Sequence, residues 1–345
     1  MTDTFARPVV VLTHRVHPEI LDLLGRVCEV VPNQDNDSLP PSELRRRAAD
    51  ADALMAFMPD QIDAAFLDGC PRLQVVAGAL KGYDNIDVDA CTERGIWLTR
   101  VDDLLTEPTA ELALGLLIGL ARHVTSGDRR VRDGFPGWRP VLYGRTLIGS
   151  TIGIVGAGVL GQAVARLLGG FDARLLYWDP QPVTPSKASA LGLERVELTE
   201  LLTQSDAVVV CAPLVPDSLH LLNREALASM RAGTLLVNVG RGSVVSEDAV
   251  TELLRGGHLG GYAADVFEFE DLSRHDRPDG PHPDLLELNE QTLFTPHLGS
   301  AVATARLAIE EHAANAILKV LAGEEPEGAV NNPNRESLTT SRPPL

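Results

Sequence analysis

The 345-residue sequence has few of the features that mark secreted, membrane-bound or nucleic-acid-binding proteins. Its four cysteines (Cys28, Cys70, Cys91 and Cys211) form no CxxC pair and stand near no histidine cluster, so we expect reduced thiols, no metal site and a cytoplasmic protein. No apolar run reaches the roughly 18 residues of a membrane span, and we expect no signal peptide. The sequence has 48 acidic residues and 30 basic residues. The resulting net charge of −18 argues against nucleic acids and anionic membranes as partners.

Short apolar runs alternate with helical patterns, an order typical of parallel sheets covered by helices on both faces. The chain is longer than one ordinary core requires, so we expect two domains. The apolar segment 109–124, directly after Pro108, predicts a buried connecting helix. In the N-terminal part the patterns predict strands at 9–12, 53–58, 73–77 and 96–98, and helices at 18–27 and 41–51.

A second alternation follows, and it predicts an α/β protein with two doubly wound parallel-sheet domains. The amphipathic helix 301–321 is expected to return to the first domain, which makes that domain discontinuous. We therefore expect one domain at 1–102 and 300–330, an inserted domain at 103–299 and a flexible tail at 331–345, with the chain loosely held from Gly323 on. The inserted domain has predicted strands at 151–155, 174–177, 207–211, 234–238, 261–266 and 292–295, and predicted helices at 161–168, 198–202, 224–229 and 247–255.

A glycine motif follows the predicted strand 151–155 and opens a predicted helix. The motif is Gly-Ala-Gly-Val-Leu-Gly, with its glycines at Gly156, Gly158 and Gly161. The first glycine permits a tight turn, the second lets the backbone approach a pyrophosphate, and the third permits close packing of helix and strand. A GxGxxG pattern by itself is weak evidence, but here the strand and helix that the motif requires flank it. The motif therefore predicts a dinucleotide site at the helix N-terminus.

An acidic residue stands where the next predicted strand ends. Asp179 follows Tyr177 and Trp178, in the position from which a carboxylate binds the hydroxyls of the adenine ribose and repels a 2′-phosphate. Aspartate is also common in solvated turns, but the glycine motif upstream favours the binding role. We therefore expect NAD rather than NADP as the cofactor.

Three ionisable residues follow predicted strands of the second domain, where open parallel sheets place their chemistry. They are Arg241, Glu270 and His297. Taken singly, each has an ordinary structural explanation: an ion pair, a solvated loop charge and a capping residue. Together they form a plausible catalytic set, in which the arginine binds an anionic substrate, the histidine moves a proton and the glutamate orients the imidazole.

With these residues, the sequence resembles the D-2-hydroxyacid dehydrogenase family from about Val9 to Leu321. The resemblance rests on Gly-Tyr-Asp-Asn-Ile-Asp from Gly82, Arg-Gly-Ser-Val-Val from Arg241, Asp-Val-Phe from Asp265 and Thr-Pro-His ending at His297. It implies a Rossmann domain inserted into a flavodoxin-like substrate domain, the Arg–Glu–His catalytic set above, and a homodimer. It also implies that Asp265 holds the nicotinamide carboxamide. Further cofactor contacts are implied for Thr109, Val159, Leu160, Pro213 and Lys81.

One branch of the family, the phosphite dehydrogenases, is similar to this chain in greater detail. Lys81 stands where hydroxyacid dehydrogenases usually have a small or apolar residue, and Lys-Gly-Tyr-Asp-Asn from Lys81 is similar to this branch. The resemblance implies that Lys81 faces the substrate together with Arg241. It also implies that Met58, Trp138, Tyr143 and Arg306 lie near the substrate. Lysines and arginines are mostly exposed, so a solvated surface position remains the alternative for Lys81 and Arg306.

The expected charges favour phosphite, a dianion near neutral pH, over a 2-hydroxy acid with one carboxylate. Lys81, Arg241 and Arg306 suit a dianion, because a monoanion would leave buried positive charge uncompensated. We therefore expect NAD-dependent oxidation of phosphite to phosphate, with water as the nucleophile and His297 as its base. The alternatives are a D-2-hydroxyacid dehydrogenase that reduces a 2-keto acid and a non-catalytic, NAD-sensing binding protein.

Overall fold

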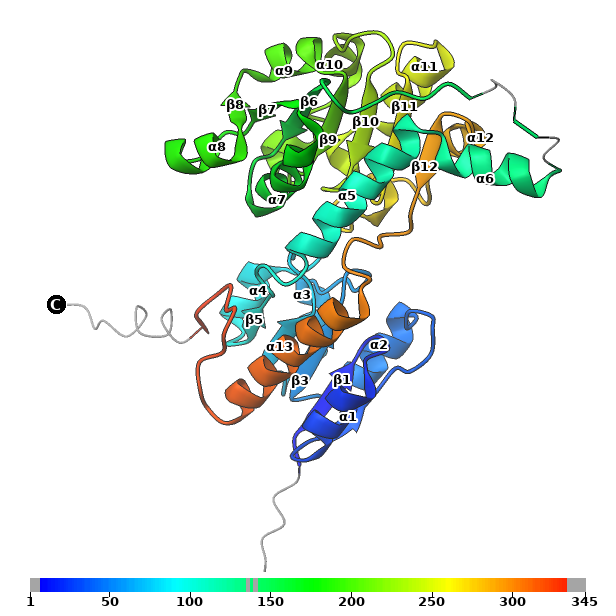
Figure 1. Ribbon diagram of the computed structural model, residues 1–345. Helices are drawn as coiled ribbons and strands as arrows, with labels where there is room; N and C mark the ends of the chain where they lie inside the picture. Colours follow the sequence, from blue (N-terminus) through cyan, green and yellow to red (C-terminus); the bar gives the residue numbers. More distant parts are fainter. Residues whose placement is uncertain (1–6, 135–136, 139–141, 334–345) are drawn as a thin grey trace, which may run out of the picture. The chain divides into compact units, whose positions relative to one another are not determined.

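The computed structural model describes residues 7–134, 137–138 and 142–333, and its chain divides into two compact units. The first unit contains the chain up to Leu105 and from Val302 on, and the second runs from Thr106 to Ala301. Each unit is a parallel sheet with helices on both faces (Figure 1). This confirms the predicted fold class. Among the described residues, no helix is long and apolar enough to cross a membrane.

The first unit has a five-stranded parallel sheet in the order β2-β1-β3-β4-β5. Successive residues of β1 enter different cores: Val10 and Leu12 face the core under α1 and α13, whereas Val11 faces the core under α2, α3 and α4. Burial on both faces explains why the central strands are continuously apolar. In Figure 1, α13 (orange) runs along this sheet with α1 packed against it. The strands are β1 (Val9–Leu12), β2 (Glu29–Val31), β3 (Ala53–Ala56), β4 (Val75–Gly78) and β5 (Trp97–Thr99), and the helices are α1 (Pro18–Gly25), α2 (Pro41–Ala48), α3 (Ala64–Leu67), α4 (Val88–Glu93) and α13 (Ala303–Leu321).

The second unit has a seven-stranded parallel sheet in the order β12-β11-β10-β9-β6-β7-β8. Helices α5, α7 and α8 cover one face, and α9, α10, α11 and α12 cover the other. The strands are β6 (Thr151–Val155), β7 (Arg174–Trp178), β8 (Leu193–Arg195), β9 (Ala207–Val210), β10 (Leu235–Asn238), β11 (Gly261–Ala264) and β12 (Thr292–Phe294), and the helices are α5 (Thr106–Ala121), α6 (Val124–Arg132), α7 (Val159–Leu168), α8 (Pro185–Leu191), α9 (Leu198–Gln204), α10 (Arg224–Ala228), α11 (Glu247–Arg255) and α12 (Pro283–Glu287).

Two of the expected segments differ in the structure. The single helix expected at 109–124 begins earlier, ends at Ala121 and is followed by α6, because His123 between them adopts a left-handed conformation with φ of 51°. The loosely held tail expected from Gly323 is wrong for residues 329–331. Val330 N donates to Leu98 O at 2.8 Å, and the Asn331 side chain accepts from Leu98 N at 2.8 Å. Residues 334–345 of the expected flexible tail lie outside the described residues.

Candidate active site

The glycine loop between β6 and α7 has the shape that a dinucleotide requires. Gly156 has φ of 90°, and a Cβ there would lie 2.7 Å from the backbone nitrogen of Ala212. A Cβ on Gly161 would collide with the carbonyl oxygen of Gly156, so this helix packs too closely on the strand for any side chain. A Cβ on Gly158, by contrast, would meet nothing within 4 Å. That open space lies beside the free N–H groups of the first turn of α7, where a pyrophosphate would bind.

Asp179, just beyond β7, is fixed beside the glycine loop. Its Oδ2 accepts from Ala157 N at 2.8 Å and its Oδ1 accepts from Gln181 N at 2.8 Å. The carboxylate therefore lies at the carboxyl end of β7, where the sequence predicted a ribose-binding residue. Pro213, another predicted cofactor contact, is exposed in the loop after β9, which approaches the glycine loop through Ala212.

The three predicted catalytic residues follow three neighbouring parallel strands, β10, β11 and β12. His297 Nδ1 lies 2.6 Å from Glu270 Oε2, and Glu270 Oε1 accepts from Phe267 N at 3.1 Å. A carboxylate on Nδ1 selects the tautomer in which that nitrogen carries the proton, so Nε2 of the neutral ring is the acceptor. The imidazole is about one-third exposed, with a side-chain exposed fraction of 32%. The exposed edge of this imidazole can therefore accept a proton at Nε2.

The loops that carry Arg241 and Glu270 pack directly on each other. Arg241 precedes a 3-10 helix at Gly242–Val244, and a Cβ on Gly242 would collide with the carbonyl group of Phe267. Asn238 fixes the Arg241 backbone, because its Nδ2 donates to Arg241 O at 2.9 Å. The absence of a side chain at Gly242 thus brings the arginine loop beside the glutamate loop.

His297 has a backbone conformation that non-glycine residues seldom adopt, with φ of 53°. The buried carboxylate of Asp265 holds this segment. Its Oδ1 accepts from Thr295 Oγ1 at 2.6 Å and from Leu298 N at 2.7 Å, and its Oδ2 accepts from Gly299 N at 2.8 Å. Strained backbone of this kind persists only where surrounding contacts enforce it. We call the Asp265 carboxylate and its three donors the Asp265 clamp.

The Asp265 clamp was not indicated by the sequence, which suggested only a cofactor contact for Asp265. A carboxylate has about four lone-pair sites, so three hydrogen bonds do not exclude that contact. Burial raises the pKa of Asp265 despite these bonds, so ionisation of the carboxyl has an energetic cost. Thr109, another predicted cofactor contact, lies beside the Asp265 clamp. A Cβ added to Gly299 would be 2.9 Å from Thr109 Oγ1 and 3.2 Å from Asp265 Oδ2.

In the first unit, the predicted substrate residues Met58 and Lys81 follow β3 and β4, so they lie at the carboxyl edge of the sheet. Lys81 Nζ donates to Asp103 Oδ1 at 3.0 Å, and the lysine side chain is 31% exposed. The loop of Met58 is fixed by Asn85 Nδ2, which donates to Asp60 O at 2.7 Å. Lys81 is therefore a half-buried cation rather than a fully solvated one.

Arg306 on α13 is more buried than a surface arginine. Its Cζ lies 5.3 Å from the ring centre of Phe57, and its Nη2 lies 3.7 Å from Glu310 Oε1. Glu310 is almost fully buried and accepts hydrogen bonds from His17 N at 2.9 Å and His17 Nδ1 at 2.8 Å. Burial lowers the pKa of Arg306, and the carboxylate of Glu310 opposes that shift. Sequence reasoning selected Arg306 but missed Glu310 and His17, which lie far apart in the chain.

Two predicted substrate residues occupy different surroundings. Trp138 and Tyr143 flank residues 139–141, which are outside the described residues, and their side chains are 85% and 81% exposed within this chain. Both side chains face solvent on the second unit, and their predicted position near the substrate stays a prediction.

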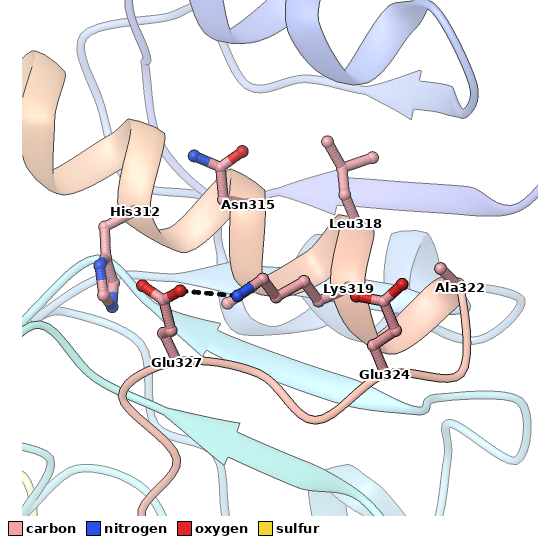
Figure 2. Close-up of a pocket in the computed structure, with 8 residues that line it drawn as sticks. His312, Asn315, Leu318, Lys319, Ala322, Glu324 and Glu327 are labelled. Atoms are coloured by element: carbon pink, nitrogen blue, oxygen red, sulfur yellow. Dashed lines mark hydrogen bonds and ion pairs between the residues drawn. The ribbon is translucent and has the colours of Figure 1, made fainter.

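A cavity of about 360 Å³ lies along the C-terminal half of α13 (Figure 2). Lys319 Nζ and Glu327 Oε1 form an ion pair at 2.6 Å in its wall, and His312 and Glu324 also line it. Its lining contains none of the residues predicted for catalysis, substrate or cofactor. The cavity is therefore separate from the candidate active site.

Comparisons with known proteins place the chain among dehydrogenases. The model for the NAD-binding domain of D-isomer specific 2-hydroxyacid dehydrogenases matches residues 114–299. Proteins named glyoxylate reductase from Thermococcus onnurineus and Pyrococcus furiosus are each 36% identical to the chain, with alignments covering 98% and 94% of it and 99% and 96% of those proteins.

Solved structures agree with this placement. The TT0316 protein of Thermus thermophilus aligns with a TM-score of 0.82 and 37% identity, over 94% of this chain and 100% of that one. The apo-structure of D-lactate dehydrogenase from Escherichia coli aligns with a TM-score of 0.79 and 27% identity, over the same shares of the two chains.

Proposed function

The chain belongs to the D-isomer specific 2-hydroxyacid dehydrogenase family, with NAD as its cofactor, and from this premise we propose that it oxidises phosphite to phosphate. The family assignment fixes hydride transfer as the reaction type. The choice of phosphite as substrate is our own, and it rests on cations of the first unit.

The observation that carries this proposal is the partly buried side chain of Arg306, of which 24% is exposed. Its ion-pair partner Glu310 stands at 3.7 Å and already accepts two hydrogen bonds from His17, so it compensates the cation only in part. Buried charge is costly unless an opposite charge is close. Lys81 is a second, half-buried cation of the same unit; it is paired with the exposed carboxylate of Asp103 at 3.0 Å, so the charge argument depends mainly on Arg306. Phosphite, a dianion near neutral pH, supplies the missing negative charge better than a single carboxylate does.

In the proposed reaction, phosphite, NAD⁺ and water become phosphate, NADH and a proton. Lys81, Arg241 and Arg306 bind the substrate oxygens, because arginine and lysine form the strongest hydrogen bonds to such anions. His297 takes the proton of the water that forms the new P–O bond, and Glu270 holds the imidazole in the tautomer this requires. NAD, when bound, accepts the hydride released as the P–H bond breaks.

The second candidate is reduction of a 2-keto acid by the same Arg–Glu–His set. The relatives named glyoxylate reductase favour this candidate over phosphite oxidation. It requires His297 as an acid and Arg241 as the carboxylate-binding residue, but it gives no role to the buried charge of Arg306. The third alternative, an NAD-sensing binding protein, has no use for the His297–Glu270 pair.

Absorbance of NADH separates the three candidates in one assay. The purified chain is mixed with NAD⁺ and phosphite, with NAD⁺ and D-lactate, or with NADH and glyoxylate. We expect NADH to form with phosphite at a higher kcat/KM than any reaction of the organic acids. Turnover of glyoxylate or lactate without phosphite turnover would establish the second candidate, and no turnover at all would favour the sensor.

A pair of arginine variants tests the charge argument. Arg306→Gln should raise the KM for phosphite by about tenfold or more, as expected for loss of a charge-assisted hydrogen bond. Arg72→Gln is the matched control, because Arg72 pairs with Asp52 at the opposite, amino edge of the same sheet. Equal effects of the two substitutions on KM would contradict the substrate role of Arg306.

We also infer that the chain forms a homodimer. Val124 and Val131 of α6 are more than half exposed, as is Ile148, and the exposed Trp138 and Tyr143 belong to the same part of the sequence. Contiguous patches of exposed apolar side chains mark protein interfaces, and the inference takes these residues, which are near one another in the sequence, as parts of one patch. Light scattering should give twice the mass of the chain, and a monomer at micromolar concentration would contradict the inference.

A further inference from the structure

A cation lies beside the predicted ribose-binding residue, and the sequence predicted no function for it. Arg195 is the last residue of β8, and it pairs in register with Tyr177 of the neighbouring parallel strand β7. Its Nη2 donates to the main-chain oxygen of Asp179 at 3.3 Å, and its side chain is exposed. The guanidinium therefore lies at the carboxyl end of β7, against the main chain of the residue expected to bind the adenine ribose.

The neighbouring carboxylate is fixed by bonds that do not involve Arg195. Asp179 accepts from Ala157 N in the glycine loop and from Gln181 N. The bond from Arg195 goes to an uncharged carbonyl oxygen, so this contact leaves its positive charge uncompensated. The carboxyl end of β7 thus presents one negative charge, from Asp179, and one positive charge, from Arg195.

Another arginine of the same strand pair shows the contrast. Arg174, at the start of β7, forms a two-point ion pair with Glu194, with Nε and Nη2 at 3.0 and 2.8 Å from the two carboxylate oxygens. That guanidinium has an anion bound in the geometry in which arginine also binds phosphate. Arg195 presents the same chemistry at the nucleotide end of the strands.

We propose that Arg195 forms a subsite for the 2′-phosphate of NADP, so that the chain binds both dinucleotides and Asp179 sets the preference for NAD. The inference rests on the NAD site and not on the substrate that is oxidised. Arg195 attracts the 2′-phosphate, Asp179 repels it, and the balance of the two charges decides how much weaker NADP binds than NAD.

Direct binding measurements test the subsite without any substrate. The probes are 5′-ADP and 2′,5′-ADP, which differ only in the 2′-phosphate, titrated calorimetrically into the full chain. Arg195→Gln should weaken 2′,5′-ADP binding about fivefold, the scale of an exposed ion pair. It should leave the Kd of 5′-ADP within about twofold. Arg174→Gln, the matched control at the other end of the strand pair, should change neither Kd.

Asp179→Asn provides the opposite change. Asparagine retains an acceptor for one of the two backbone N–H groups and removes the repelling charge, so 2′,5′-ADP should bind about fivefold more tightly. In the double variant with Arg195→Gln, most of that gain should be lost. The contribution of Arg195 should also shrink when salt is raised, because exposed charge pairs are screened.

Two results would overturn the subsite. One is an unchanged Kd for 2′,5′-ADP in Arg195→Gln, and the other is equal weakening of both probes, which would assign Arg195 a structural role. Absence of phosphite turnover would refute the proposed substrate but would leave these Kd values unaffected. The two failures are therefore distinguishable.

Discussion

Replacement of Asp265 by asparagine tests whether the Asp265 clamp holds the catalytic histidine. Asparagine has nearly the same shape but only one oxygen, which can still accept from Thr295 Oγ1 and Leu298 N. Its NH2 group would then face Gly299 N, a donor against a donor. His297, between these partners, would lose part of the support for its left-handed backbone.

The magnitude follows from the bonds that change. Loss of one hydrogen bond to a charged group costs about 1.5–3 kcal/mol. Removal of the charge offsets part of this cost in unfolding free energy, because burial raises the pKa of Asp265 and so disfavours its ionised form. We expect a net loss of about 2 kcal/mol in unfolding free energy, or about 4–8 °C in Tm for a unit of this size. Displacement of His297 from Glu270 should lower kcat by about 10²-fold or more.

Thermal unfolding without cofactor separates the clamp from the predicted nicotinamide contact, because only the clamp can act when NAD is absent. The control Thr295→Val removes one of the three bonds and should lower the unfolding free energy by only about 1 kcal/mol. A Tm for Asp265→Asn equal to that of the native chain would refute the clamp, even if kcat fell, since the loss would then belong to cofactor binding.

Three further predictions concern separate residues. Lys81→Ala should raise the KM for phosphite by about tenfold and leave the calorimetric Kd of NAD unchanged; a weakened Kd with an unchanged KM would remove Lys81 from the substrate site. Glu270→Gln should lower kcat less than His297→Ala, which should cost about 10²–10⁴-fold, because an amide stabilises the protonated imidazole less; an unchanged kcat in Glu270→Gln would contradict the pairing. Burial raises the pKa of Glu247 above its value of about 4.3 in the unfolded chain. As pH falls from 7 towards about 4.3, the unfolding free energy of the native chain should therefore rise relative to that of Glu247→Gln. Chemical unfolding at several pH values should show this rise, and a difference that does not change with pH would refute it.

The fold could be predicted from the sequence wherever burial is two-sided. Central strands such as β1 and β10 are apolar on both faces, so they appear as continuous runs in the sequence. The edge strands β2 and β8 were missed, because at least two of the three residues in each carry charge or lie partly in solvent, whereas the equally short edge strand β5 is buried throughout and was predicted. The break between α5 and α6 was missed because it depends on the backbone conformation of His123, which no residue type requires.

The sequence suggests candidate members of the site, but it does not show the contacts that hold them in place. Arg241 and His297 each follow a buried strand, a local pattern that the sequence displays. The partners that fix the site come from elsewhere in the chain: Asp265 bonds to Gly299, and Glu310 bonds to His17 across 293 residues. Hydrogen bonds of this kind are set by packing, so one sequence without its structure carries no local signal for them.

The charge distribution explains how an acidic chain can bind an anion. The net charge of −18 is a property of the whole surface, where pairs such as Arg174 with Glu194 lie in water and contribute little. Arg306 differs from such pairs, because burial removes water and weakens screening around its guanidinium. A few cations placed in this way dominate the local potential even when the distant field is negative. Under the proposed phosphite oxidation, the position and burial of these cations, rather than the total charge, would therefore set the choice of substrate.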